Sequence, residues 1–116
     1  MKTTTKLFAM VALFTATLFT SCKKEETANP VASFTITSND TLYVSDTFTF
    51  NNTSTGADSY IWNFDDGSTS TAVNPTKTYD GYDFIDCEET FTITLTATKN
   101  GKSTTTSKNV VVYFCS

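Results

Sequence analysis

The chain has 116 residues, of which 39% are hydrophobic, 14% aromatic and only 17% charged. A chain of this size has room for one small domain with a single core, and it is richer in aromatic residues than an intrinsically disordered chain. The formal net charge of −4 argues against nucleic-acid binding, which depends on clustered lysine and arginine side chains.

An apolar segment near the N-terminus predicts export. Residues 7–19 are almost all apolar or small, and they follow Lys2 and Lys6. These residues are too few to span a bilayer, which needs about 20, and the pattern is typical of a signal peptide. We therefore expect residues 1–21 to be a signal peptide.

The predicted signal ends in Phe19-Thr20-Ser21-Cys22. This ending resembles the lipobox of bacterial lipoproteins, although that family prefers Leu where Phe19 stands. The resemblance implies cleavage before Cys22, a lipid on this cysteine and attachment of the mature chain to a membrane. The alternative is an ordinary secretory signal followed by a free cysteine.

A charged segment follows Cys22, and we expect residues 22–30 to form a tether. The string Cys22-Lys23-Lys24-Glu25-Glu26 is similar to the export signal of surface lipoproteins in Bacteroidetes-type bacteria. This resemblance implies a position in the outer membrane with the domain exposed at the cell surface. The alternative is a solvated linker that carries no such address.

After residue 30 the hydrophobic pattern has a period of two. Ser33–Thr37, Thr47–Asn51 and Phe91–Thr98 each alternate apolar residues with Thr, Ser or Asn. No window of a dozen residues has the spacing of an amphipathic helix, and the abundant threonine favours strands. Turn residues separate the runs. We therefore predict that residues 31–116 form an all-β sandwich of about seven strands.

The clearest hairpin is predicted at Lys99-Asn100-Gly101-Lys102, because Asn-Gly suits a type I′ turn. A two-residue turn there places Cys87 and Cys115 within one residue of register. A disulfide between them would suit an exported protein and would stabilise it by about 3.5 kcal/mol. The alternative is two unpaired thiols; a zinc site is less favoured, because the chain has no histidine.

The segment Tyr60–Gly67 contains the single tryptophan of the chain. Trp62 and Phe64 lie on the same face of a predicted strand because side chains alternate, and such a pair more often anchors a core than binds a ligand. Asp66 and Gly67 are typical of a turn. We therefore expect both rings in the core, the alternative being an exposed platform for a ligand.

This segment resembles the Trp-Asp-Phe-Gly-Asp-Gly motif of PKD (polycystic kidney disease) domains. Further similar stretches extend from Val31-Ala32-Ser33-Phe34 to Val110-Val111-Val112. The resemblance implies an immunoglobulin-like β-sandwich that serves as a non-catalytic extracellular module for protein or carbohydrate contacts, or as a spacer. Asn63 and Asp65 depart from the motif, and Asp65 replaces a glycine where the backbone is expected to be permissive.

The segment from Asp80 to Glu89 is longer than the corresponding turn of PKD domains. Its candidate ligand-binding residues are aromatic or acidic, namely Tyr82, Asp83, Phe84, Asp86 and Glu88. Such residues suit stacking on sugar rings or contact with a protein, so we expect a polysaccharide or protein partner here. Asp80, Asp83 and Asp86 are also candidate Ca²⁺ ligands, although they lack the spacing of an EF-hand and acidic loops are mostly only solvated.

Catalysis is not expected. The chain has no histidine, its serines lie in threonine-rich strands without a nucleophile elbow, and a small filled sandwich leaves little room for a substrate cleft. We therefore expect a non-catalytic, lipid-anchored envelope module without a cofactor, which binds carbohydrate or protein. The alternative is a passive spacer.

Overall fold

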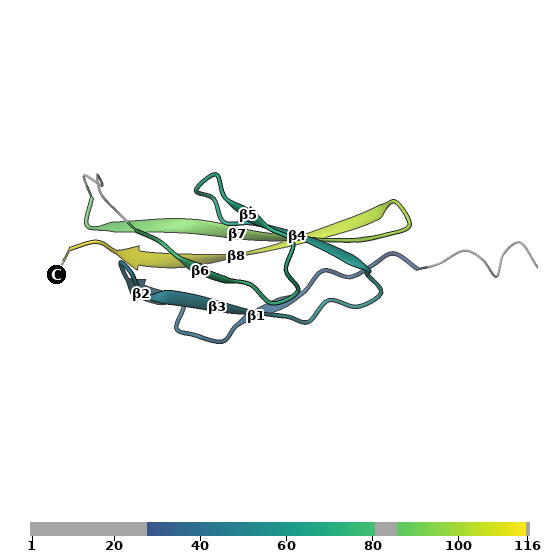
Figure 1. Ribbon diagram of the computed structural model, residues 1–116, viewed down its shortest axis with the longest axis horizontal. Coiled ribbons are helices and arrows are strands. Elements are labelled where there is room, and N and C mark those ends of the chain that lie inside the picture. The colour runs from purple at the N-terminus through teal and green to yellow at the C-terminus, as the bar shows by residue number, and fades with distance from the viewer. Residues whose placement is uncertain (1–27, 81–85, 116) are drawn as a thin grey trace, which may run out of the picture.

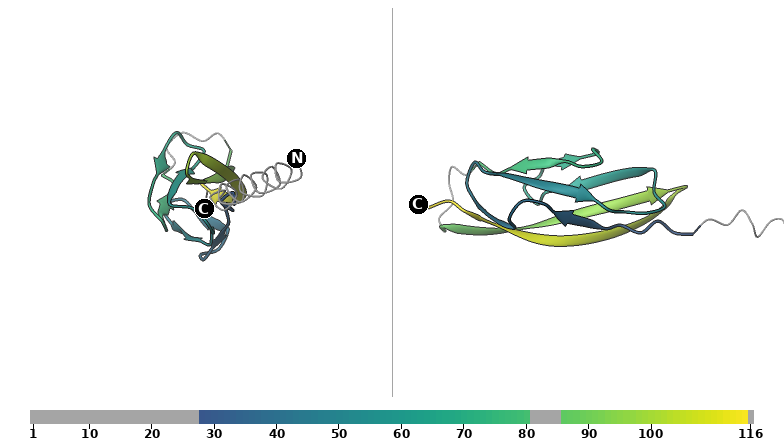
Figure 2. Two further views of the ribbon diagram at one scale, coloured as in Figure 1. Left: turned by 90° about the vertical axis from the view of Figure 1, so that its right-hand side faces the viewer. Right: turned by 90° about the horizontal axis from the view of Figure 1, so that it is seen from below.

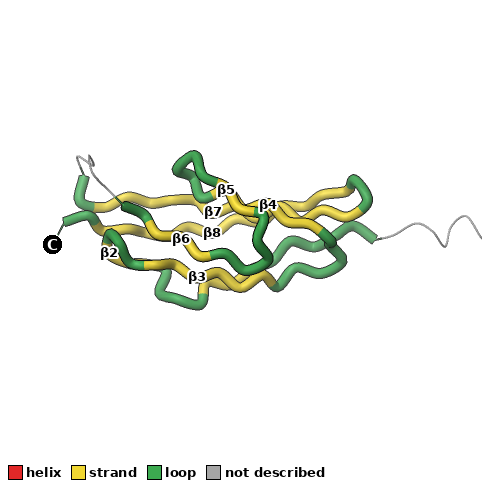
Figure 3. Tube along the Cα trace, in the orientation of Figure 1, coloured by secondary structure: helices red, strands yellow, loops and turns green. Residues whose placement is uncertain are grey.

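The computed structural model describes residues 28–80 and 86–115. These residues form strands, turns and loops (Figure 3). Within them we find no helix long and apolar enough to cross a membrane. The predicted sites that lie outside the described residues are the signal peptide at 1–21, Cys22, Tyr82, Asp83 and Phe84.

Two sheets pack face to face and confirm the predicted sandwich (Figure 1). The three-stranded sheet has the order β1-β3-β6, with β1 at Phe34–Ile36, β3 at Thr47–Asn52 and β6 at Thr76–Thr78. The five-stranded sheet has the order β2-β8-β7-β4-β5. Its strands are β2 Thr41–Tyr43, β8 Lys102–Tyr113, β7 Glu88–Lys99, β4 Ser59–Asn63 and β5 Thr69–Ser70.

The strands form two layers (Figure 2). The core lies between them, and its residues follow the predicted period of two. On β7 the side chains of Phe91, Ile93, Leu95 and Ala97 are buried, whereas the threonines between them face outward. The buried cluster consists of Phe34, Phe48, Phe50, Trp62, Phe64, Tyr79, Phe91, Ile93, Leu95, Val110 and Val112. The outer threonines and serines bond one another across strands, which makes that face polar.

Trp62 occupies the centre of this core. Its side chain is 0% exposed, and its ring packs against Phe34 and Phe50 at centroid distances of 5.0 and 5.6 Å. The buried indole N–H donates a hydrogen bond to the carbonyl oxygen of Ala72 at 2.9 Å. Burial therefore leaves no unpaired donor on the indole, and Trp62 is a core anchor rather than a ligand platform.

Tyr79 ties the sheets together. Its hydroxyl donates a 2.6 Å hydrogen bond to the carbonyl oxygen of Phe64, and its ring stacks on Phe91 at 4.0 Å between centroids. Burial, together with the charges of Asp66 and Asp65, raises the pKa of Tyr79 far above its ordinary value. The hydroxyl therefore remains a donor at neutral pH.

The long hairpin has the predicted register. Asn100 and Gly101 both have positive φ, 50° and 79°, as a type I′ turn requires. The pairing runs from the turn to its last pair, Glu88 with Tyr113. The predicted disulfide is present just beyond that pair, between Cys87 and Cys115, with 4.9 Å between the Cα atoms.

One predicted boundary is wrong. Sequence reasoning placed Glu88 in a loop that extends to Glu89, whereas both residues lie at the start of β7. The physical reason is that β8 continues to Tyr113, so Glu88 and Glu89 have backbone partners in Tyr113 and Val112. Glu88 is therefore a candidate ligand residue at the first position of a strand and not in a loop.

Loss of the disulfide should destabilise the domain. The bond joins residues separated by 28 positions, and loop-closure entropy for such a span corresponds to about 3.5 kcal/mol. Urea unfolding of the Cys87→Ser/Cys115→Ser variant should show this decrease in the free energy of unfolding. Reducing agent should lower the stability of the wild type and leave the variant unchanged. Equal stability of the oxidised and reduced wild type would contradict the prediction.

Candidate functional site

The turn after β4 explains how an aspartate replaces the glycine of the PKD motif. Asp65 has a φ of 66°, in the left-handed region that aspartate tolerates better than most residues. Its N–H donates to Asn63 Oδ1 at 2.9 Å, and its carboxylate accepts the N–H of Thr92 at 3.0 Å. The pairing of β4 with β7 ends at Asn63 and Thr94, so no β4 backbone carbonyl is paired with the N–H of Thr92. The Asp65 carboxylate accepts this N–H instead.

Asp66 holds the same turn through charge. Its carboxylate accepts the N–H of Ser68 at 3.0 Å and forms an ion pair with Lys77 at 2.5 Å. The Lys77 ammonium also lies 5.5 Å from the Phe64 ring centroid and 5.1 Å from that of Tyr79. Burial opposes ionisation of Asp66, but the bonds from Lys77 and Ser68 outweigh it and lower its pKa. This turn is therefore a partnered structural element.

β2 and the last residues of β8 lie at the end of the sandwich where the chain reaches its C-terminus (Figure 1), and each of these strands ends in a tyrosine. Tyr43 on β2 and Tyr113 on β8 are neighbours in parallel register, and their ring centroids are 5.9 Å apart. Tyr43 is 62% exposed and Tyr113 is half-buried. Both rings lie on the outer face, because Val110 and Val112 point inward.

Glu88 completes this group. It lies opposite Tyr113 across the β7–β8 ladder. A hydrogen bond between the Glu88 carboxylate and the Tyr113 hydroxyl, together with the negative charge of Glu88, raises the pKa of Tyr113. The phenol therefore stays protonated at neutral pH. We call Tyr43, Glu88 and Tyr113 the distal surface.

A shallow pocket of about 300 Å³ adjoins the distal surface and is lined by Tyr43, Val44, Tyr113, Phe114 and Cys115. Two hydrogen bonds connect this part of the chain to the residues on either side of the undescribed segment 81–85. The N–H of Ser45, a residue with a φ of 72°, donates to the carbonyl oxygen of Tyr79 at 3.1 Å, and the N–H of Phe114 donates to that of Cys87 at 2.8 Å.

The predicted ligand residues have different places. Asp80 and Asp86, at the two ends of the undescribed segment, are exposed, and Asp80 accepts a 3.5 Å hydrogen bond from the Ser45 hydroxyl. Among the described residues, no three carboxylates, cysteines or histidines are grouped so that they could hold a metal ion; Asp83 lies outside that search. Glu88 is the one candidate that the described structure brings beside exposed aromatic rings.

Sequence reasoning missed the two tyrosines. The sequence did contain a signal for Tyr113. Side chains alternate along a strand, so if Val110 and Val112 point inward, Tyr113 must point outward. Tyr43 had none, because its position depends on the parallel pairing of β2 with β8, two strands far apart in the sequence.

The architecture is an immunoglobulin-like β-sandwich. The sequence pattern of the PKD domain family matches residues 27–113. The chain therefore belongs to the PKD domain family. A comparison with curated proteins found no match.

Several solved structures are similar. The PKD1 domain of the Vibrio cholerae metalloprotease PrtV has 28% sequence identity and a TM-score of 0.57, over 74% of this chain and 99% of that one. The PKD1 domain of Vibrio anguillarum Epp has 24% identity and a TM-score of 0.59, over 78% and 100% of the two chains. Both are structures of a single PKD1 domain, and each match covers nearly the whole of that domain.

A third similar structure comes from a work on promiscuous carbohydrate-binding modules of the β-sandwich superfamily. It has 23% identity and a TM-score of 0.66, and the match covers 78% of this chain and 37% of that one. At this identity the likeness supports the fold alone.

Acid should weaken the domain through Asp66. Because its folded pKa lies below the ordinary 3.8, ionised Asp66 stabilises the fold above that value, and the stabilisation is lost as the pH falls through the folded pKa. Asp66→Asn should cost about 1–3 kcal/mol at pH 7 and should reduce the loss of stability between pH 5 and pH 2. Urea unfolding at several pH values measures both effects.

The matched control is Asp58→Asn, which removes an exposed ion pair of 3.9 Å with Lys99. This change should alter stability by less than about 1 kcal/mol. An unchanged acid profile in Asp66→Asn would contradict the prediction.

Proposed function

We propose that this protein is a non-catalytic lipoprotein of the cell envelope whose single PKD domain binds carbohydrate or protein through the distal surface. The observation that carries the proposal is the pair of exposed Tyr43 and half-buried Tyr113, whose ring centroids are 5.9 Å apart, beside the Glu88 carboxylate and a pocket of about 300 Å³. Membership of the PKD family is consistent with an interaction module.

The chemistry of the distal surface suits such ligands. The faces of tyrosine rings pack against the C–H faces of sugars, while phenol and carboxylate groups hydrogen-bond hydroxyls. Tyrosine is also enriched among the residues that dominate protein interfaces. The Tyr113 phenol is protonated at neutral pH, because its ordinary pKa is 10.0 and Glu88 raises it further; it can therefore both donate and accept hydrogen bonds.

The direction of the chain suits display at a cell surface. The carbonyl oxygen of Pro30 accepts a 2.9 Å hydrogen bond from Thr104, next to the β7–β8 turn, whereas Tyr113 lies at the other end of β8 (Figure 1). A strand of 12 residues is about 40 Å long. A lipid on Cys22 would therefore hold the turn end near the membrane and the distal surface far from it.

The alternative function is a passive spacer. The described chain enters the sandwich at the end that holds the β7–β8 turn and leaves it at the end marked C (Figure 1), which is also the arrangement of a spacer. In that case the distal surface has no ligand, and its tyrosines are only a solvated part of the sheet.

Binding tests distinguish the two. Residues 28–116 are assayed against a panel of polysaccharides and extracellular matrix proteins, with and without Ca²⁺. Tyr43→Ala/Tyr113→Ala should weaken any saturable binding at least tenfold while its thermal unfolding stays cooperative. Ile61→Ala, which alters an exposed apolar side chain on the same outer face, should leave binding unchanged.

The Tyr82→Ala/Phe84→Ala variant separates the predicted segment from the distal surface. Loss of binding in that variant alone would move the site to residues 80–86, and dependence on Ca²⁺ would support the carboxylates Asp80, Asp83 and Asp86 as ligands. No binding by the wild type across the panel would favour the spacer.

The lipid anchor is tested on the full chain in a bacterial host given a labelled fatty acid. Wild-type protein should carry the label and sediment with membranes, and Cys22→Ser should lose both properties. Cys87→Ser is the matched control and should keep the label. A labelled Cys22→Ser variant, or an unlabelled wild type, would sink this part of the proposal.

A further inference from the structure

The chain crosses from one sheet to the other between β1 and β2, and this crossing leaves part of a sheet edge open. β8 pairs with β7 over its full length, but β2 pairs with β8 only from Val111 to Tyr113. β1 pairs with β3 of the other sheet. From Thr105 to Asn109, no described strand covers the outer edge of β8.

The direction of the backbone groups along this edge follows from two bonds. The N–H of Val111 donates to the carbonyl oxygen of Asp40 at 2.9 Å, and the carbonyl oxygen of Tyr113 accepts from Val44 at 2.8 Å. Backbone groups alternate in direction along a strand, so Thr105, Ser107 and Asn109 point to the same side as Val111 and Tyr113. Their N–H and C=O groups therefore form a row ready for another strand.

Both ends of the row are fixed. At one end Thr104 accepts the N–H of Ala32 through its hydroxyl at 3.0 Å, and at the other end Asp40 bonds to Val111. The five residues between them span about 17 Å. This length fits a short extended segment and is too short for a long strand.

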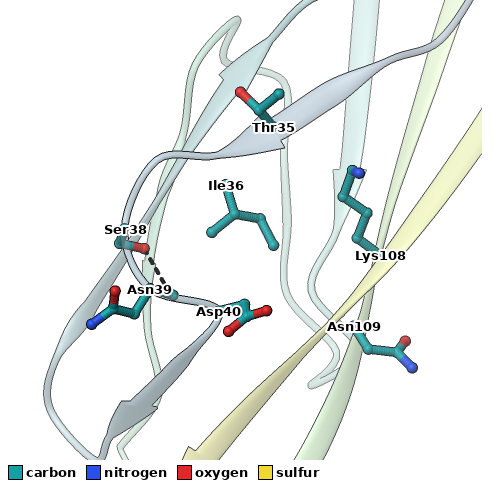
Figure 4. Close-up of a pocket in the computed structure, with 7 residues that line it drawn as sticks. All are labelled: Thr35, Ile36, Ser38, Asn39, Asp40, Lys108 and Asn109. Atoms are coloured by element: carbon teal, nitrogen blue, oxygen red, sulfur yellow. Dashed lines mark hydrogen bonds between the residues drawn. The ribbon is translucent and has the colours of Figure 1, made fainter.

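A groove of about 620 Å³ runs beside the open edge. Figure 4 shows Ile36 directed into it, with Ser38 and Asp40 on one side and Lys108 and Asn109 of β8 on the other. The groove thus combines an apolar floor with polar walls. A side chain of an added strand would have both kinds of surface within reach.

Lys108 gives the groove a charge preference. Its ammonium lies 5.8 Å from the centroid of the Phe34 ring, and the described ion pairs join Lys77 to Asp66 and Lys99 to Asp58. Among the described residues no carboxylate forms an ion pair with Lys108, and Asp40 is the one carboxylate that lines the groove with it. An acidic side chain brought into the groove would give the Lys108 ammonium an ion-pair partner.

We propose that an extended segment of a partner protein adds to β8 at Thr105–Asn109, with an acidic side chain directed into the groove beside Lys108. The segment lies beside β8, in line with β2. No described strand fills this position, because β1 pairs with the other sheet. Main-chain bonds to Thr105, Ser107 and Asn109 provide affinity, and Lys108 provides selectivity. This site is separate from the distal surface and does not depend on the function proposed for it.

The first test uses ¹⁵N-labelled residues 28–116 and capped seven-residue peptides. The peptide Thr-Thr-Val-Asp-Val-Thr-Thr should shift the amide signals of Thr105, Ser107 and Asn109 saturably. Replacement of its Asp by Lys should weaken binding at least fivefold. Two further peptides carry N-methyl groups on the odd-numbered or on the even-numbered residues. Only one of them should lose binding, because only one set of N–H groups faces β8.

Variants of the protein test the same contacts. Ser107→Pro removes an N–H that faces away from β7 and should weaken binding at least tenfold, whereas Ser107→Ala keeps this N–H and should bind as the wild type does. Lys108→Glu should reverse the preference in favour of the Lys peptide. If Ser107→Pro fails to fold, the N-methylated peptides still decide the backbone contacts.

Several results would overturn the proposal. One is the absence of shifts at the edge with either peptide. Another is tighter peptide binding by Lys108→Ala, or self-association of this variant. Either result would mean that Lys108 prevents other strands from pairing with the edge. Edge shifts caused by oligosaccharides and not by peptides would assign the groove to a different ligand.

Discussion

The register of the β7–β8 hairpin is the constraint on which the rest of this domain depends. The Asn100-Gly101 turn closes one end of the hairpin, and the Cys87–Cys115 disulfide closes the other. A slip of one residue would turn every side chain to the opposite face, so that Phe91, Ile93 and Leu95 would leave the core. The same register sets Glu88 opposite Tyr113 and orients the open edge of β8.

The PKD motif connects this hairpin to the remainder of the sandwich. Trp62 fills the centre of the core, and Tyr79 hydrogen-bonds the backbone at Phe64 while it stacks on Phe91. The aspartate at position 65 bonds the backbone of Thr92 just where β4 has ended. A departure from the family pattern is thus accommodated by a residue that tolerates positive φ and supplies an additional acceptor.

One topological step produces both the distal surface and the open edge of β8. When the chain leaves β1 and joins the other sheet as β2, it places Tyr43 beside Tyr113. The same step leaves the outer edge of Thr105–Asn109 without a described neighbouring strand and opens the groove beside it. The aromatic distal surface is suited to sugar rings or protein side chains, whereas the edge offers mainly backbone groups and Lys108, which forms no ion pair with a described carboxylate. The two surfaces therefore differ in the chemistry that they can recognise.

The sequence by itself determined the features that local pattern controls. Alternation predicted the inward face of β7 and the burial of Trp62, and the Asn-Gly turn fixed a register that predicted the Cys87–Cys115 bond. Tertiary structure alone decided that Tyr43 lies beside Tyr113, that β7 extends back to Glu88, and that β8 has an open edge. The reason is physical: period and turn chemistry act between neighbours in the chain, whereas parallel pairing and strand ends depend on which distant segments supply hydrogen-bond partners.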